Sequence, residues 1–180
     1  ELRSDGFSLV GYNVWPTFGD EDDRSDSELT LPPMIGHNGH VAKHVICPSS
    51  PDVLEYISNR FSMLAEYHPD FIWVDDDARL YTKGTELGYP CFCNICLSEF
   101  QDGRWESRDK IVEGLNHPDN VKLREEWIEY NAFRLDRVCK HIKEAVRNVD
   151  QELDLAFMTV GPTHTSYSGD FIRRCMETLE

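Results

Sequence analysis

The sequence has few basic residues and no long apolar run. It contains 18 Lys and Arg against 33 Asp and Glu, which gives a formal net charge of −15. A surface with this charge repels phosphate backbones and anionic lipids, so we expect neither nucleic acid nor a membrane surface as a partner. No run of about 18 apolar residues is present, and the opening ELRSDGFSLV lacks the basic and apolar regions of a signal peptide. These absences predict a soluble, cytoplasmic protein.

Two common kinds of functional motif are also missing. The sequence has no Gly-rich loop between a strand and a helix, which disfavours nucleotide binding of the Rossmann or P-loop kind. It has no nucleophile elbow and no legible Ser, His, Asp order, which disfavours a serine hydrolase. Because 40% of the 180 residues are hydrophobic, the chain still carries enough apolar side chains for the core of one globular domain.

The apolar pattern predicts strands that alternate with helices. Buried apolar segments predict strands at about residues 8–14, 71–74 and 153–162. Apolar residues that recur every three or four positions predict helices at about 50–68 and 120–148, with a short helix from 96 and another after 168. The acidic, Gly- and Pro-rich residues 17–43 are expected to form a long loop before a short extended segment at 44–48. This order predicts an α/β fold of parallel (β/α) units with right-handed crossovers.

Polar residues gather at the expected carboxyl ends of the strands, where parallel α/β folds bind their ligands. Tyr12, Asn13 and Trp15 close the first strand, and side chains of these types stack on sugars or hydrogen-bond to them. His164 follows the last strand and is a candidate to face a ligand, with an exposed loop histidine as the open alternative. Trp73 lies within the second strand and is expected in the core. The pattern therefore favours a binding site at one end of the sheet.

Three consecutive carboxylates, Asp75, Asp76 and Asp77, close the second strand. Repulsion and partial burial raise a carboxyl pKa, which is what a general acid needs near neutral pH. Strand alternation points Asp76 away from its two neighbours. Two other interpretations stay open, namely a solvated strand end and a Ca²⁺ or Mg²⁺ site held by two of the carboxylates. Arg79 is near enough in sequence to pair with one of the acids and lower its pKa instead.

Cys91, Cys93 and Cys96 lie within six positions, in the stretch GYPCFCNICLSEF. They are too close together to pair comfortably as disulfides, which need converging side chains at a suitable Cα separation. A tetrahedral zinc ion takes four soft ligands, and Cys47 is the natural fourth because it ends an extended segment one βα unit earlier. Four thiolates leave no position for water, so such a zinc would be structural. The open alternative is a set of buried apolar thiols or a thioredoxin-like pair.

The remaining candidate metal ligands have simpler interpretations. Cys139 and Cys175 lie in expected helices and are predicted to be core residues. His37, His40 and His44 are spaced by three and four positions, but they lie in a loop rich in Gly and Pro. We therefore expect no shared helix face for these histidines.

Three segments together carry a resemblance to a known family. HVICPSSPDV, then a strand that ends in acids, then CFCNICLSEF resemble the glycoside hydrolase family 42 β-galactosidases and related glycosidase-like TIM barrels. In that family a Cys-Pro-x-x-Pro segment supplies one zinc thiolate, and a Cys-x-Cys-x-x-Cys turn after the fourth strand supplies three. The resemblance covers about residues 41–100, and it implies a structural zinc bound by Cys47, Cys91, Cys93 and Cys96.

The same resemblance implies a carbohydrate substrate and hydrolysis of a glycosidic bond by two carboxylates. The family's fourth strand ends in Asp-Asn-Glu, whose Glu is the catalytic acid/base, and Asp75, Asp76 and Asp77 stand at these positions. Asp77 is therefore the expected proton donor and Asp76 the alternative. Asp75 and Arg79 are expected to contact the substrate. The family's nucleophile lies on the seventh strand, outside this chain.

By this resemblance, residues 1–180 would be a single unit containing about strands three to five of a partial TIM barrel. The chain begins without Met and ends within an amphipathic pattern, FIRRCMETLE, so we expect it to be a fragment of a longer protein. Such a fragment is expected to be inactive alone and, through its open sheet edge, to self-associate into a homo-oligomer. Two other functions stay open: a catalytically inactive, zinc-stabilised carbohydrate-binding barrel, and a hydrolase that uses a hard cation at the aspartate cluster.

Overall fold

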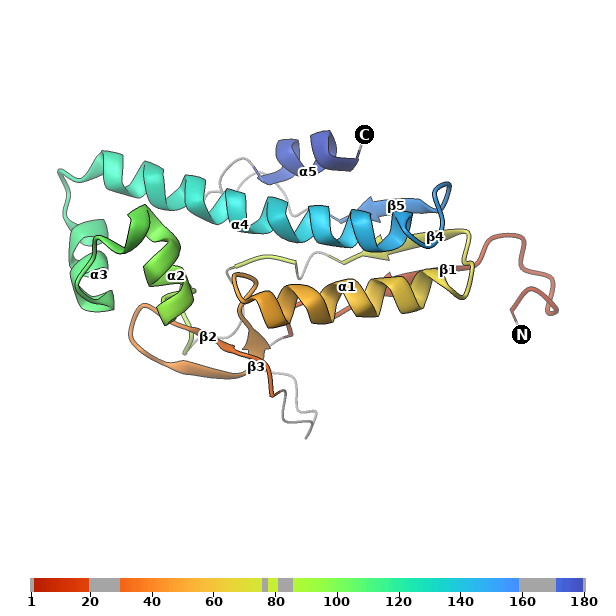
Figure 1. The fold of residues 1–180 in the computed structure, drawn as a ribbon, viewed down its shortest axis with the longest axis horizontal. Helices are drawn as coiled ribbons and strands as arrows, with labels where there is room; N and C mark the ends of the chain where they lie inside the picture. The colour runs from red at the N-terminus through yellow and green to blue at the C-terminus, as the bar shows by residue number, and fades with distance from the viewer. Residues whose placement is uncertain (1, 20–29, 76–77, 81–85, 159–170, 180) are drawn as a thin grey trace.

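The computed structural model describes residues 2–19, 30–75, 78–80, 86–158 and 171–179 (Figure 1). It combines a parallel sheet and an antiparallel hairpin with several helices. In chain order the elements are β1 (Gly11–Val14), β2 (Pro33–Ile35), β3 (Val41–Ile46), α1 (Pro51–Ala65), β4 (Phe71–Val74), α2 (Asn94–Glu99), the 3-10 helix η1 (Phe100–Gly103), α3 (Arg108–Asn116), α4 (Val121–Arg147), β5 (Asp154–Phe157) and α5 (Phe171–Leu179).

The parallel sheet has the strand order β1-β4-β5. Asn13 pairs with Trp73 in register, and Trp73 pairs with Ala156. Each pair of neighbouring strands is linked by helical segments, α1 before β4 and α2 to α4 before β5. The predicted α/β fold is therefore confirmed as a parallel sheet whose strands are connected by helices. The strands of the described part form no closed barrel, so the assignment to a TIM barrel stays a prediction.

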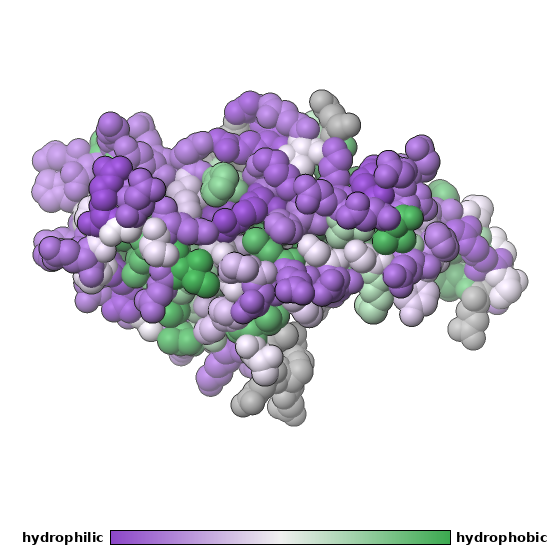
Figure 2. Space-filling view, in the orientation of Figure 1, coloured by the Kyte–Doolittle hydropathy of each residue, from purple (hydrophilic) through white to green (hydrophobic). Residues whose placement is uncertain are grey.

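One face of the sheet packs against α1 and α4, which lie side by side (Figure 1). Val14, Ile72 and Val74 point to this face, are buried, and join a core with apolar residues of both helices. Strand alternation sends Trp73 to the opposite face, where its side chain is 40% exposed rather than in the core as expected. Figure 2 shows that the surface over α1 and α4 is largely hydrophilic, as amphipathic helices require.

The two main helices follow the predicted sequence signals. Ser50 occupies the N-cap position of α1, Pro51 is its first residue, and Asp52 lies in its first turn. The apolar spacing that predicted α1 and α4 is confirmed by burial along the inner side of each helix, namely Leu54, Ile57 and Phe61 of α1 and Ala132, Leu135, Val138, Ile142 and Ala145 of α4.

The prediction that residues 17–43 form one long loop is wrong. β2 and β3 form an antiparallel hairpin that begins inside this segment. Its turn contains Asn38 and Gly39, and Gly39 adopts a φ of +86°, which favours glycine. Met34 of β2 and Val45 of β3 are buried in the main core. Their packing stabilises the hairpin, although the sequence of this segment shows no regular apolar period.

A smaller apolar cluster lies beneath α2, α3 and the first turns of α4. It is centred on Phe92, Phe100, Ile111, Leu115 and Trp127. Helix α3 contributes to this cluster and was not predicted from the sequence. Within the described residues, no helix is both long and apolar enough to cross a membrane.

Helix α5 packs against α4. The predicted core positions of Cys139 and Cys175 are confirmed, because both are buried and their Sγ atoms lie 2.9 Å apart where the two helices meet.

Candidate functional site

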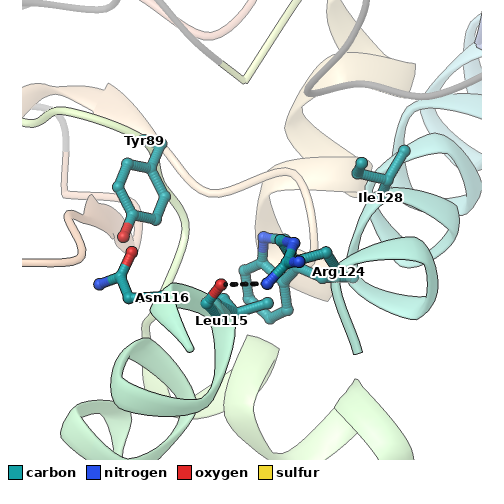
Figure 3. A pocket seen from close by; sticks show the side chains of 6 residues that line it. Tyr89, Leu115, Asn116, Arg124 and Ile128 are labelled. Atoms are coloured by element: carbon teal, nitrogen blue, oxygen red, sulfur yellow. Dashed lines mark hydrogen bonds between the residues drawn. The ribbon is translucent and has the colours of Figure 1, made fainter. Parts of the chain in front are cut away.

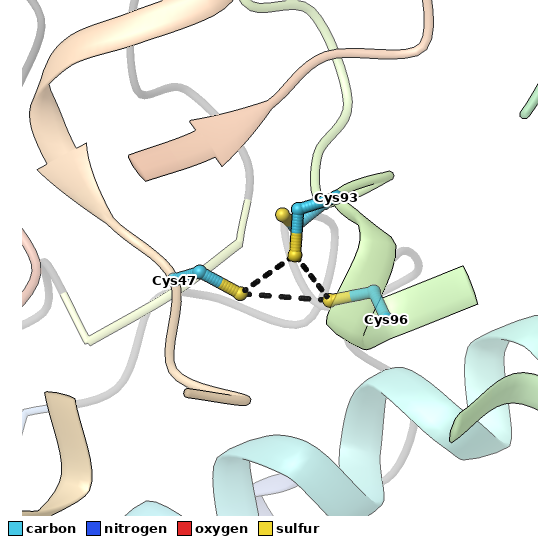
Figure 4. Close-up of side chains that lie close together, drawn as sticks. Cys47, Cys93 and Cys96 are labelled. Atoms are coloured by element: carbon cyan, nitrogen blue, oxygen red, sulfur yellow. Dashed lines mark hydrogen bonds between the residues drawn. The ribbon is translucent and has the colours of Figure 1, made fainter. Parts of the chain in front are cut away.

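Four buried cysteines meet at one point of the fold, and Figure 4 labels three of them, Cys47, Cys93 and Cys96. The Sγ atoms of Cys47, Cys91, Cys93 and Cys96 all lie within 4.8 Å of one another. The Cys47–Cys96 sulfur distance is 3.5 Å, and Cys93 Sγ lies 3.6 Å from each of these two atoms. Among the residues that the structure describes, this is the one group of His, Cys, Asp or Glu gathered closely enough to hold a metal ion.

The sulfur separations match a single tetrahedral metal ion. A zinc ion with Zn–S bonds of about 2.3 Å places its sulfurs about 3.8 Å apart, along the edges of the tetrahedron. The separations among the sulfurs of Cys47, Cys93 and Cys96, 3.5 and 3.6 Å, are close to this value, and Cys91 Sγ lies within 4.8 Å of the other three, so small movements of the side chains would admit the ion. The predicted convergence of the four cysteines is therefore confirmed, and the cluster is able to hold a metal ion.

Local backbone structure explains how two of the cysteines converge. Cys93 occupies the N-cap position of α2, and its carbonyl accepts the Leu97 N–H. Cys96 follows three residues later, which places both side chains on one side of the helix. The residue before Cys93 is tied to the hairpin, because the Phe92 N–H donates to the Ile35 carbonyl at 2.7 Å.

The hairpin that the sequence did not predict supplies the rest of the site. Cys47 directly follows β3, and its N–H donates to the Pro32 carbonyl. At the end of β2, the Ile35 N–H donates to Cys91 Sγ at 3.4 Å. The hairpin therefore delivers one sulfur and also a hydrogen-bond donor to another.

The four thiols have different tendencies to ionise. Burial raises the pKa of Cys91 well above its usual value, because a charged sulfur loses its hydration there. Hydrogen bonds from the thiols of Cys47, Cys91 and Cys93 lower the pKa of Cys96 well below its usual value, and the positive charge of Arg134 acts in the same direction. Cys96 is thus the sulfur best prepared to bind a cation as a thiolate.

The predicted sugar-binding residues divide between the two faces of the sheet. The Asn13 side-chain amide donates to the Asp75 carboxylate at 2.9 Å. Alternation places both side chains on the same face of the sheet as Trp73, the face opposite to α1 and α4, which we call the open face. Tyr12 lies on the helix-covered side, where its ring meets the Tyr67 ring edge-on at a centroid distance of 6.4 Å. The structure therefore brings Asn13 and Asp75 together and places Tyr12 apart from them.

The other candidates lie near the same end of the sheet or outside the described residues. Trp15 directly follows β1 and is 54% exposed. Arg79 is half-buried, four positions after Asp75. Asp76, Asp77 and His164 lie outside the described residues, so their predicted roles stay predictions.

A separate pocket of about 230 Å³ lies between α3 and α4 (Figure 3). Tyr89, Leu115, Asn116, Arg124, Trp127 and Ile128 line it. The guanidinium group of Arg124 donates to the carbonyls of Leu115, His117 and Pro118, at the end of α3. Arg124 is therefore engaged in capping that helix.

Sequence reasoning overlooked Arg134, a buried residue of α4 whose Nη1 lies 3.0 Å from Cys96 Sγ. A signal for it exists in the sequence. Trp127, Asn131, Arg134 and Val138 follow one another at spacings of four, three and four, which places a cation on the inner side of the helix. A charged residue at such a position usually has a buried partner.

No protein-family model and no curated protein matches this chain. Any statement about its function therefore depends on its own residues and on the resemblance carried by its cysteine segments.

Proposed function

We propose that this chain is a zinc-stabilised unit of a glycosidase-like barrel that binds carbohydrate at the carboxyl ends of its parallel strands. The observation that carries the proposal is the buried four-cysteine cluster, which joins the segment after β3 to the segment after β4. Four thiolates in a tetrahedron are a usual ligand set of structural zinc, and soft sulfur ligands disfavour Mg²⁺ and Ca²⁺.

The proposed role of the metal is structural. Four protein thiolates fill the coordination sphere, so no position is left for a water molecule or a substrate. When bound, the ion would link two long segments that are distant in sequence. Residues 86–93 have no helix or strand of their own, and a bond from the metal to Cys91 and Cys93 would fix them against the hairpin.

Three features support carbohydrate as the ligand. The partly exposed Trp73 offers an aromatic ring on the open face of the sheet, and Asn13 and Asp75 offer an amide and a carboxylate beside it. Aromatic rings and groups of this kind stack on sugar rings and hydrogen-bond to hydroxyls. The resemblance of the cysteine segments to glycosidases points to the same substrate class.

For catalysis by the whole barrel, the proposal assigns proton donation to Asp77, with Asp76 as the alternative. Trp15, Arg79 and His164 are assigned to the surroundings of the sugar. The second carboxylate of a two-carboxylate mechanism would come from a strand outside this chain. Under this proposal the chain alone binds sugar without hydrolysing it.

Binding without catalysis by the whole protein is the second candidate. Asp75 accepts a hydrogen bond from Asn13, which fixes the carboxylate as an acceptor for hydroxyl groups. In addition, the position of the family's catalytic Glu is held here by the shorter Asp77. A carboxyl that is one methylene shorter reaches less far toward a glycosidic oxygen.

The test combines metal analysis with sugar binding. Purified chain is expected to contain one zinc ion per molecule, and Cys47→Ala or Cys93→Ala is expected to abolish it, whereas Cys139→Ala keeps it. Binding of lactose, followed by NMR, should weaken in Trp73→Ala and persist in Tyr67→Ala, which removes an exposed aromatic ring from the other side. Absence of zinc would reject the metal proposal, and zinc-loaded protein without sugar binding would reject the carbohydrate proposal.

A further inference from the structure

Arg134 places a buried positive charge directly against the cysteine cluster. Its side chain is fully buried, and Nη1 donates to Cys96 Sγ at 3.0 Å. Nη2 donates to the side-chain oxygen of Asn131, and the guanidinium carbon lies 4.6 Å from the centre of the Tyr130 ring. Cys96 of α2 and two residues of α4, Asn131 and Tyr130, therefore hold the guanidinium plane in one orientation, with one edge toward the sulfur.

A buried arginine needs negative charge nearby, because its guanidinium does not lose its proton inside a protein. A carboxylate is the usual partner. Among the described residues, no carboxylate forms an ion pair with Arg134, although Arg137 on the same helix pairs with Glu99 at 3.0 Å. The cysteine cluster can supply that negative charge, because Arg134 Nη1 lies 3.0 Å from Cys96 Sγ. Its charge is thus directed at the cluster.

The charges of a metal-bound cluster explain this arrangement. Four thiolates carry four negative charges, and a divalent ion cancels two of them. The remaining net charge of −2 would be buried, which is costly without a nearby cation. One guanidinium reduces it to −1, and the hydrogen bond to Cys96 withdraws electron density from the sulfur that accepts it.

We propose that Arg134 is a positioning residue of the metal centre, which orients the Cys96 thiolate and balances the charge of a divalent ion bound by four thiolates. This inference rests on the proposed zinc site and adds the group that tunes it. Asn131 and Tyr130 act through Arg134, because they fix its guanidinium, whereas the Ile35 N–H donates to a different sulfur, that of Cys91. Arg134 links α4 to the metal centre, so the long helix and the cysteine turn would be stabilised together.

The test measures zinc affinity by competition with a chromogenic chelator in Arg134→Gln, Arg134→Lys and Arg137→Gln. Loss of a group that orients a metal ligand typically weakens binding about 10- to 100-fold, and we expect this for Arg134→Gln. Arg134→Lys keeps the charge but loses the planar fork, so an intermediate loss is expected. Arg137→Gln removes an arginine three positions further along α4 that pairs with Glu99, and its affinity should match the parent.

Two further measurements, the absorption of bound Co²⁺ and the alkylation rate of Cys96, would not change if Arg134 only stabilised the fold. With Co²⁺ as the probe, the sulfur-to-metal charge-transfer band should shift in Arg134→Lys and not in Arg137→Gln. In the zinc-loaded protein, iodoacetamide should modify Cys96 several-fold faster in Arg134→Lys, with the rate at Cys47 unchanged, because the metal-bound thiolate has lost a hydrogen-bond donor and is more nucleophilic. Arg134→Lys keeps the test valid if Arg134→Gln fails to fold.

Two results would count against the inference in different ways. A folded Arg134→Lys variant with parental zinc affinity, charge-transfer band and Cys96 alkylation rate would overturn the role of Arg134 and leave the zinc site intact. A parent protein that binds neither Zn²⁺ nor Co²⁺ would overturn the proposed zinc site itself, and the role of Arg134 with it.

Discussion

Asn13 and Asp75 form a hydrogen bond between the carboxyl ends of neighbouring parallel strands, with the amide nitrogen 2.9 Å from the carboxylate oxygen. The pair lies one residue before the end of β1 and one residue after the end of β4. Both side chains share the open face of the sheet with Trp73, while Val14 and Val74 turn inward to the helices. Asn13, Asp75 and the Trp73 ring therefore make up the part of the proposed sugar site that lies within the described residues.

Replacing Asn13 with Ala should weaken sugar binding. The substitution removes one donor and leaves the Asp75 carboxylate without this partner, and a hydrogen bond of this kind contributes about 1 kcal/mol, or roughly a fivefold change in affinity. The measurement is the dissociation constant for lactose. Tyr12→Phe is the matched control, because Tyr12 lies on the helix-covered side against Tyr67. An equal loss in the two variants would contradict the assignment of the site to the open face.

The chain alone should not hydrolyse nitrophenyl glycosides. Its parallel strands form no closed barrel in the described part, and the proposed mechanism requires a second carboxylate from another strand. Turnover by this chain would contradict the interpretation as part of a barrel.

In a protein that contains the whole barrel, Asp77→Asn should lower kcat about 100-fold or more on substrates whose leaving group needs a proton. Parental activity of that variant would reject Asp77, and the same comparison for Asp76→Asn tests the alternative.

The sequence was informative where one physical signal dominates. Apolar spacing over many turns defined α1 and α4, because a long amphipathic helix has few alternative ways to bury its apolar side. The convergence of the four cysteines was also predictable. Three thiols in one turn cannot satisfy one another as disulfides, and Cys47 was the thiol that topology could bring to them.

The sequence was less informative where short-range signals are weak. Strand β2 has three residues between Pro and Gly, which is too short to display a period, although Asn38-Gly39 is a turn signal that marks the hairpin. Alternation required Tyr12 and Asn13 to face opposite ways, but it did not say which one faced the helices. The role of Arg134 depends on which residue of another segment lies beside it, and a single sequence does not reveal that contact.

Acid should remove one contribution to stability at the start of β1. The Asp70 carboxylate accepts the Val10 N–H at 2.7 Å and pairs with Arg3, and these contacts lower its pKa below the ordinary value of 3.8. A pKa that is lower in the folded state gives stability that is present above 3.8 and is lost as the pH falls through the folded pKa. Asp70→Asn should therefore melt at a lower temperature than the parent at pH 7.

The comparison across pH isolates this effect. The difference in melting temperature between parent and Asp70→Asn should shrink as the pH falls below 3.8. Asp109→Asn is a suitable control, because Asp109 is exposed and pairs only with its neighbour Arg108 among the ion pairs described. A difference that stays constant from pH 7 to pH 3 would contradict the assigned role of Asp70.

Removal of metal should change the reactivity of four cysteines and leave two unchanged. All six cysteines are buried. In the zinc-loaded protein, we expect slow alkylation at every position under native conditions. After treatment with a strong chelator, Cys47, Cys91, Cys93 and Cys96 should react with iodoacetamide, as the ion no longer holds them. Cys139 and Cys175 should stay protected between α4 and α5, and mass spectrometry of the peptides resolves each position. Equal protection of all six after chelation would contradict the metal centre.

Loss of one zinc ligand should destabilise the fold far more than loss of a buried cysteine elsewhere. A ligand that binds only the folded state stabilises it by about 4 kcal/mol at a concentration 1,000-fold above its Kd, and Cys47→Ala should lose a contribution of this size. Cys139→Ala should cost about 1 kcal/mol, the usual loss for a small change in packing.

The measurement is the free energy of unfolding in urea, with zinc and again with chelator. Chelator should remove the gap between the parent and Cys47→Ala while leaving the gap for Cys139→Ala, because the first depends on the metal and the second on packing. A reducing agent alone should change neither gap, since the six cysteines are free thiols. A gap for Cys47→Ala that survives chelation would show that Cys47 stabilises the hairpin by packing and not as a metal ligand.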